Sequence, residues 1–246
     1  VACVYFFVLL RVRRKTTFVC INPEKFSLQK YIVLGVCAVG IPAAIQNLLN
    51  VTGMTILNNF TSSYGAQAVA AMGITQKINM VPLQVAMGFS QGIMPLISYN
   101  YASGNHRRMK ETIFFTIKTL LPVLVVVSLG YFAGAGLLTR AFMDNEAIVA
   151  YGTRFLRGFC LGLPFLCMDF LAVGVFQAVG MGKAALSFAI LRKIVLEIPA
   201  LYLLNLLFPL YGLSYAQLVA ELVLSIASVI MLARIFRRMQ REDGAS

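Results

Sequence analysis

The chain has 246 residues, of which 59% are hydrophobic and only 12% are charged, and its mean hydropathy is +0.81. A soluble domain of this length needs more polar surface, so the composition excludes a soluble globular protein. A net charge of +12 would also suit nucleic-acid binding, but the basic residues fall in short clusters between long apolar runs and form no nucleic-acid motif. We therefore expect an integral membrane protein.

The first residues, VACVYFFVLL, are apolar but span only half a membrane, and we interpret residues 1–30 as the end of a preceding helix and a basic loop. The segment lacks the charged start and the cleavage site of a signal peptide. Six apolar runs follow, each long enough to cross a hydrocarbon layer of about 30 Å, which takes about 20 helical residues. They cover residues 31–60, 67–101, 112–138, 147–179, 184–208 and 213–236.

The sequence thus predicts an all-α, polytopic membrane protein with a six-helix bundle over residues 31–236 and a cytoplasmic tail over 237–246. Basic clusters occur after alternate spans, and the connections between them carry little charge. Cytoplasmic loops are enriched in Lys and Arg, so these clusters and the C-terminus should face the cytoplasm of a plasma (inner) membrane. The clusters are Arg11–Lys15 with Lys25 and Lys30, His106–Lys110, Lys183 and Arg234–Arg241.

The second span ends in GFSQGIMPLISYNYASGNHRRMKE, which mixes small, polar and basic residues with apolar ones. Gly88 and Gly92 are spaced to let a neighbouring helix approach closely, and Pro95 should bend the helix. An amide in lipid costs several kcal/mol, so Gln91 and Asn100 should face protein or a wet cavity. Each of the first five spans contains proline, and bent helices around a cavity are typical of transporters: Pro42, Pro82, Pro95, Pro122, Pro164 and Pro199.

This stretch resembles helix 8 of the multidrug and toxic compound extrusion (MATE) transporters. The family pattern is matched by Gly88, Gln91, Gly92, Pro95 and Asn100, with Arg107 or Arg108 as its basic residue. IPAAIQNLLN is similar to helix 7 of the family, FQAVGMGK to the end of helix 10, and LRKIVLEIPALYLLN to helix 11. The resemblance covers essentially the whole chain, with its motifs in the family's order.

The resemblance implies one lobe of a two-lobe transporter with twelve spans, here the tail of helix 6 and helices 7 to 12. Substrate would bind between or within the lobes, and access would alternate by rocking. The missing N-terminal lobe of the same polypeptide would then be this chain's partner, and the chain alone should not transport.

Three acidic residues lie within spans, where each is a functional-site candidate because a charge in the bilayer costs at least about 2.5 kcal/mol. Glu197 follows Lys193 by four residues, which favours an ion pair on one helix. Glu221 has no basic residue at helical spacing and is a candidate for binding ions or substrate. Asp169 lies near the middle of its span, and Lys77, a cation deep in another span, is a plausible partner for it.

Some sodium-coupled relatives place carboxylates on helices 7 and 10 of this lobe. The matching run here, residues 31–60, has no acid and offers the amides Gln46, Asn47 and Asn50. A site made of these amides with Asp169 remains open, as does coupling through a proton on Asp169 or through the missing lobe. Gln91 from helix 8 completes the candidate binding residues.

We conclude from the sequence that the chain belongs to an antiporter that exports organic compounds, with cationic ones expected, in exchange for H+ or Na+. It contains no metal-ligand spacing and no catalytic set, so we expect no metal, no cofactor and no enzyme activity. Two alternatives remain. A lipid-linked glycan flippase of the same superfamily would need several cavity arginines, and mid-span regions suggest only Lys77. A non-transporting scaffold or receptor would lack a polar cavity.

Overall fold

A computed structural model of the chain describes residues 29–243. Contacts divide the chain into two units, Val1–Ala38 and Val39–Ser246. In the first unit the described residues form only the start of helix α2. The account below concerns the second unit. The predicted end of a preceding span, most of the N-terminal basic loop and the last three residues of the tail lie outside the described residues.

The described residues are helical, with no strand among them. Each predicted span corresponds to one helix or one run of helices. The bounds are α2 Lys30–Ser62, α3 Ala66–Ala102, α4 His106–Arg140, α5 Glu146–Cys160, α6 Leu163–Ala178, α7 Gly182–Ile190, the π-helix η2 Leu191–Glu197, α8 Ile198–Leu207 and α9 Gly212–Asp243.

Four helices, α2, α3, α4 and α9 as far as Arg237, are long and apolar enough to cross a membrane. The bent pair α5 and α6 forms a fifth span if it is taken as one. The segments α7, η2 and α8 follow one another without an intervening residue and occupy the remaining predicted run. The all-α bundle of membrane helices is therefore confirmed.

The α5–α6 pair is bent, and the continuous run α7, η2 and α8 changes from π-helix to α-helix; each of these changes adjoins a proline. Helices α5 and α6 meet at an angle of 48°, and Pro164 stands in the first turn of α6. Pro199 stands in the first turn of α8, directly after the π-helix. A proline lacks the N–H that bonds to the preceding turn and clashes with that turn's carbonyl, so a regular helix is disfavoured on its N-terminal side. By contrast, α3 continues as one helix through Pro82 and Pro95.

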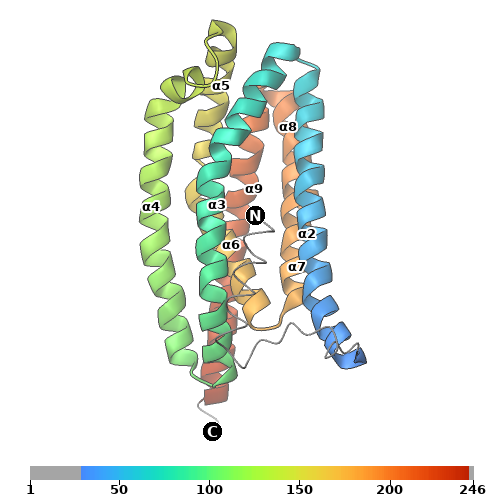
Figure 1. Ribbon diagram of the computed structural model, residues 1–246, viewed down its shortest axis with the longest axis vertical. Helices are drawn as coiled ribbons and strands as arrows, with labels where there is room; N and C mark the ends of the chain where they lie inside the picture. The colour runs from blue at the N-terminus through green and yellow to red at the C-terminus, as the bar shows by residue number, and fades with distance from the viewer. Residues whose placement is uncertain (1–28, 244–246) are drawn as a thin grey trace, which may run out of the picture. The chain divides into compact units, whose positions relative to one another are not determined.

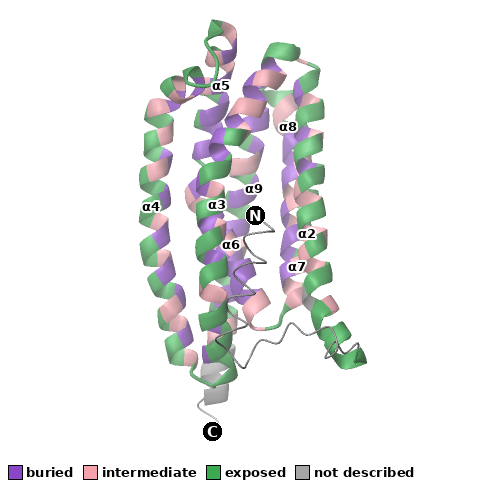
Figure 2. Ribbon diagram, viewed as in Figure 1, coloured by how far each residue is buried: buried purple, intermediate pink, exposed green. Residues whose placement is uncertain are grey.

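Helix α6 lies at the centre of the unit. It packs against α3, α4 and α9, and it is apolar on all sides, as expected of a buried helix. In Figure 2 the buried residues concentrate on α6 and α9, whereas the outer faces of α2, α3 and α4 are exposed. Buried leucines and phenylalanines such as Leu171 and Phe176 form the core around α6.

The turns that connect the helices place the basic clusters at one end of the unit. In Figure 1 the α3–α4 turn, the α6–α7 turn and the end of α9 all lie toward the bottom of the view. Gly104 and Gly180 allow two of these turns, because both have a positive φ that other residues rarely adopt. At the same end Lys110 lies over the ring of Phe236, with its ammonium 5.7 Å from the ring centroid.

Candidate functional site

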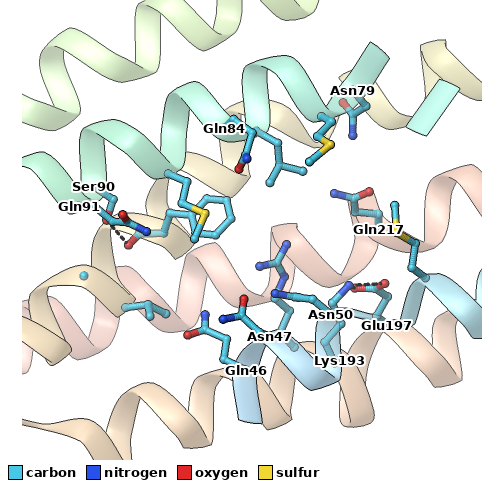
Figure 3. Close-up of a pocket in the computed structure, with 18 of the residues that line it drawn as sticks. Gln46, Asn47, Asn50, Asn79, Gln84, Ser90, Gln91, Lys193, Glu197 and Gln217 are labelled. Carbon is cyan, nitrogen blue, oxygen red and sulfur yellow. Dashed lines mark hydrogen bonds and ion pairs between the residues drawn. The ribbon is translucent and has the colours of Figure 1, made fainter. Parts of the chain in front are cut away.

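A pocket of about 430 Å³ opens between α2, α3, α6, η2 and α9. Its most frequent polar lining groups are amides. In Figure 3, Gln46, Asn47 and Asn50 from α2 lie across the pocket from Asn79, Gln84 and Gln91 of α3. The full set of lining amides is Gln46, Asn47, Asn50, Gln76, Asn79, Gln84, Gln91, Gln177 and Gln217.

Few of these amides are satisfied by the protein itself. Gln177 Nε2 donates to Gln46 Oε1 at 3.5 Å, which is a long hydrogen bond, and Gln76 Nε2 donates to Asn58 Oδ1 at 3.3 Å. The other lining amides make no side-chain hydrogen bond within residues 29–243, and the buried Oδ1 of Asn79 is among the atoms without a partner. A buried amide such as Asn79 normally finds a partner. The other lining amides are half-buried or exposed, so these groups are available to a bound molecule or to water.

Thioethers and phenyl rings make up much of the remaining wall. Three of the methionines, Met80, Met87 and Met94, are spaced by seven residues along the inner face of α3. Methionine is flexible and polarizable, so a methionine-lined wall adapts to ligands of different shape. The apolar side chains that complete this wall include Met54, Phe159 and Phe170.

Helices α3 and α6 approach each other closely beneath the pocket. Ser90 Oγ donates to the carbonyl oxygen of Phe170 at 2.7 Å. A Cβ on Gly174 would overlap Ser90 Oγ, so only glycine permits this approach. The contact holds the methionine face of α3 against the helix that carries Asp169.

Behind the pocket, one arginine joins two buried carboxylates from different helices. Arg192 Nη1 lies 3.1 Å from Asp169 Oδ2, and Arg192 Nη2 donates a short 2.5 Å hydrogen bond to Glu221 Oε1. The three residues are 6%, 1% and 0% exposed, in the order arginine, aspartate and glutamate. The guanidinium also lies over the ring of Phe170, 5.4 Å from its centroid. Of the three, only Arg192 also lines the pocket.

A second ion pair adjoins the first. Lys193 Nζ bonds to both carboxylate oxygens of Glu197, at 2.7 and 2.6 Å, which confirms the pair expected from their spacing. Gly53 of α2 lies against this pair, because a Cβ there would come within 3.3 Å of Lys193 Nζ. Both residues line the pocket.

The π-helix explains how one short segment supplies charges to both pairs. Its backbone bonds join residues five apart, as from the Ile198 N–H to the Lys193 carbonyl. Arg192 and Glu197 are separated by the same interval, so both side chains fall on the inner side and both are buried. A regular α-helix would place these two side chains on different faces.

The expected pairing of Asp169 with Lys77 is wrong. Lys77 is exposed on α3, outside the pocket lining, and Asp169 is bonded to Arg192 instead. The expectation that Lys77 was the only cation deep in a span is also wrong, because Arg192 is buried and bonded to Asp169. Sequence spacing could not reveal Arg192, because its partners lie on other helices. Two acids buried in different spans do, however, favour a cation nearby. The segment LRKIVLE, which contains Arg192, could supply it.

The motif residues divide between the pocket and its surroundings. Gln91 lines the pocket, and Pro95 lacks the N–H that would otherwise bond to the Gln91 carbonyl. The close packing expected at Gly88 and Gly92 is absent from the described residues, since nothing lies within 4 Å of a Cβ placed at either. Gly158 of α5, by contrast, lies against Ser214 of α9.

Two further motif residues shape the α3–α4 turn. Asn100 is buried and its Nδ2 donates to the Leu96 carbonyl at 2.8 Å. Arg107 is exposed and pairs with Glu111 at 3.0 Å. Neither lines the pocket.

Comparison with known proteins gives a consistent result. The family model described as MatE matches residues 42–203. The multidrug export protein MepA of Staphylococcus saprophyticus is 32% identical over 226 residues, which cover 92% of this chain and 49% of that protein. MepA of Staphylococcus aureus strain MRSA252 is also 32% identical, over 94% of this chain and 51% of its own length. The chain therefore spans about half the length of these relatives.

Solved structures share the fold. A crystal structure of MATE in complex with MaL6 superposes with a TM-score of 0.86 at 19% identity, covering 97% of this chain and 54% of that one. The Vibrio cholerae MATE transporter VcmN in the bent form gives a TM-score of 0.85 at 16% identity, over 96% and 54% of the two chains.

Proposed function

Because the chain belongs to the MatE family of transporters, we propose that it forms one lobe of a secondary antiporter that exports organic compounds. The family match confirms the resemblance that the sequence motifs indicated. Since the chain spans half the length of its relatives, the proposal includes a second, N-terminal lobe of the same polypeptide. The six-helix lobe would comprise residues 31–236, after the loop at 1–30 and before the tail at 237–246.

The observation that carries the proposal is the amide-lined pocket. Amides without internal partners offer both donors and acceptors, and the surrounding methionines and phenylalanines offer polarizable surface. Such a wall suits aromatic compounds with several polar groups. Cationic compounds would be accepted through the amide oxygens of the lining, which are hydrogen-bond acceptors with partial negative charge. Among the described residues, Glu197 is the one acid in the lining, and it is already bonded to Lys193.

The coupling ion, H+ or Na+, would bind at the buried ion cluster. Asp169 and Glu221 are buried charges within a membrane protein, and such residues usually mark an ion pathway. Their arginine partner also lines the pocket, so an ion bound at the cluster would influence a compound bound in the pocket. Gln46, Asn47, Asn50 and Gln91 would then contact the compound and not the ion.

The flippase and scaffold alternatives receive less support. The matched relatives are named multidrug export proteins, and the pocket arginine is engaged by two carboxylates, so it is not free to hold a pyrophosphate. The polar pocket argues against a scaffold.

The lobe would lie in the plasma (inner) membrane with the basic end of Figure 1 toward the cytoplasm. Arg107 and Lys183 stand in the first turns of α4 and α7 at that end, and Arg234 stands in the last part of α9. The C-terminus would then be cytoplasmic.

Export from vesicles tests the proposal. The complete polypeptide that contains this chain, reconstituted in lipid vesicles, should move ethidium, a planar aromatic cation, when an ion gradient is imposed. Residues 1–246 reconstituted alone should move none, because one lobe cannot alternate access. Robust export by residues 1–246 alone, or no export by the complete polypeptide under any gradient, would contradict the proposal.

A further inference from the structure

The Arg192 guanidinium occupies the position that a metal cation would take between two facing carboxylates. Its two terminal nitrogens bond to Asp169 Oδ2 and to Glu221 Oε1. A hard cation in proteins is held by oxygen ligands that converge on one point. Here these two carboxylate oxygens already accept hydrogen bonds from the guanidinium. The pair therefore has a resident cation that is part of the chain.

What remains for an external ion is one oxygen on each carboxylate. Asp169 Oδ1 and Glu221 Oε2 are both buried and have no hydrogen-bond partner among residues 29–243. A hard cation typically needs about six oxygen ligands, and no three His, Cys, Asp or Glu side chains gather as a metal site in the part of the chain that the structure describes. A proton needs only one oxygen and no shell of ligands.

The charge balance also allows one proton. Arg192 with its two carboxylates carries a formal charge of −1, and one proton makes the group neutral. Among the described residues, the other charged side chains that act on the two carboxylates are Lys193 and Glu197 of the same π-helix. These two neutralise each other. Helices α2 and α3 add no charged side chain to the pocket lining.

We propose that Arg192 excludes sodium from the Asp169–Glu221 pair, so that the pair exchanges a single proton. The proton belongs to the pair as a unit, since two carboxylates that share one guanidinium do not titrate independently. This inference rests on the proposed antiport and specifies its coupling ion. Arg192 is a positioning residue in it, because it acts through the two carboxylates.

Arg192 also connects the proton to the pocket. Its guanidinium lies over Phe170, and both side chains line the pocket. When the pair is ionised, its charge more than offsets that of the guanidinium, whereas a protonated pair leaves the pocket more positive by one unit. Proton uptake thus weakens the binding of an organic cation, and by reciprocity a bound cation weakens proton uptake.

Thermal unfolding of the complete polypeptide in detergent tests whether Arg192 keeps sodium out of the carboxylate pair. Wild type should unfold at the same temperature in NaCl and in choline chloride of equal concentration. Arg192→Gln, which vacates the gap between the carboxylates, should gain a stabilisation of several degrees in NaCl alone. Arg157→Gln, an exposed arginine on α5, is the matched control and should show no sodium effect. Sodium-specific stabilisation of wild type, or none in a folded Arg192→Gln, would overturn the proposal.

Glu221→Gln decides the question if Arg192→Gln does not fold. It leaves Arg192 and Asp169 as a neutral pair and should fold. In vesicles, a pH gradient without sodium should drive ethidium export by wild type, whereas a sodium gradient at equal pH should not. Glu221→Gln should lose the pH-driven export and still bind ethidium.

The outcomes of the vesicle experiment are distinct. Sodium-driven export by wild type, or pH-driven export retained by Glu221→Gln, would overturn the inference and leave the antiport standing. Export under neither gradient would reject the proposed function and this inference with it.

Discussion

The pocket wall on α2 and α3 differs from the ion cluster on α6, η2 and α9 in how its polar groups are satisfied. The wall carries amides such as Asn50 and Gln84 that make no hydrogen bond within residues 29–243. In the cluster every charged side chain is bonded to an opposite charge. Unsatisfied neutral groups suit ligands that vary, whereas a fixed set of charges suits one small ion. Changes in the two regions should therefore have different consequences.

The largest effect is expected from Arg192→Met, which leaves two buried carboxylates without their cation. Breaking a buried ion pair by removing one partner costs about 3–5 kcal/mol of unfolding free energy. Thermal unfolding in choline chloride measures the loss, with Arg140→Met, at an exposed arginine, as control. Adding Asp169→Asn and Glu221→Gln to Arg192→Met should restore much of the stability. If the single variant is as stable as the control, the cluster does not contribute as described.

A smaller loss of unfolding free energy is expected from a change at the contact between α3 and α6, where the pocket wall meets the helix that carries Asp169. Gly174→Ala places a methyl group against Ser90 Oγ, which should separate α3 from α6 and cost about 1–3 kcal/mol. Gly88→Ala is the matched control, because no atom of the described part of the chain lies within 4 Å of a Cβ placed there. Alanine is the better helix former, so this control should not lower the unfolding temperature of residues 1–246. Equal effects at both glycines would contradict the close contact.

Next in size is the removal of one amide from the wall. Asn50→Leu should weaken ethidium binding by roughly fivefold, since one hydrogen bond contributes about 1 kcal/mol. Titration of ethidium fluorescence measures the dissociation constant. Asn59→Leu provides the comparison, because Asn59 is an exposed amide on the same helix but outside the pocket lining. The wall would have no role in binding if both variants bind ethidium as wild type does.

The smallest effect is expected from Lys77→Met. Lys77 is exposed and lies outside both regions, and substitutions at such positions change stability by less than about 0.5 kcal/mol. The unfolding temperature of residues 1–246 should therefore stay within error of wild type. A large loss would revive the pairing with Asp169 that the structure contradicts.

Some features of the fold and of the two regions could be predicted from the sequence, and each of them for a physical reason. The spans were predictable because bilayer thickness imposes a length on apolar runs. The amides of α2 and α3 were predictable because an amide facing lipid is costly. The pair Lys193–Glu197 was predictable because residues four apart share a helix face.

Other features depend on tertiary structure. The bond between Arg192 and Glu221 joins different helices, and no spacing rule reveals it. The π-helix that turns Arg192 and Glu197 to the same side is equally invisible in the sequence pattern. Nor could composition show which glycines meet a neighbour, since Gly158 is closely packed and Gly88 is not.

The most direct test of the division between wall and cluster is Asp169→Asn in the complete polypeptide, with ethidium affinity and gradient-driven export measured on the same preparation. The substitution keeps Arg192 paired with Glu221 and leaves the wall intact. We predict that export is lost while ethidium still binds, with an affinity lowered as far as proton uptake lowers it in the wild type, because the substituted pair keeps the charge of the protonated pair. Export at the wild-type rate, or a loss of ethidium binding as large as the loss of export, would contradict the account.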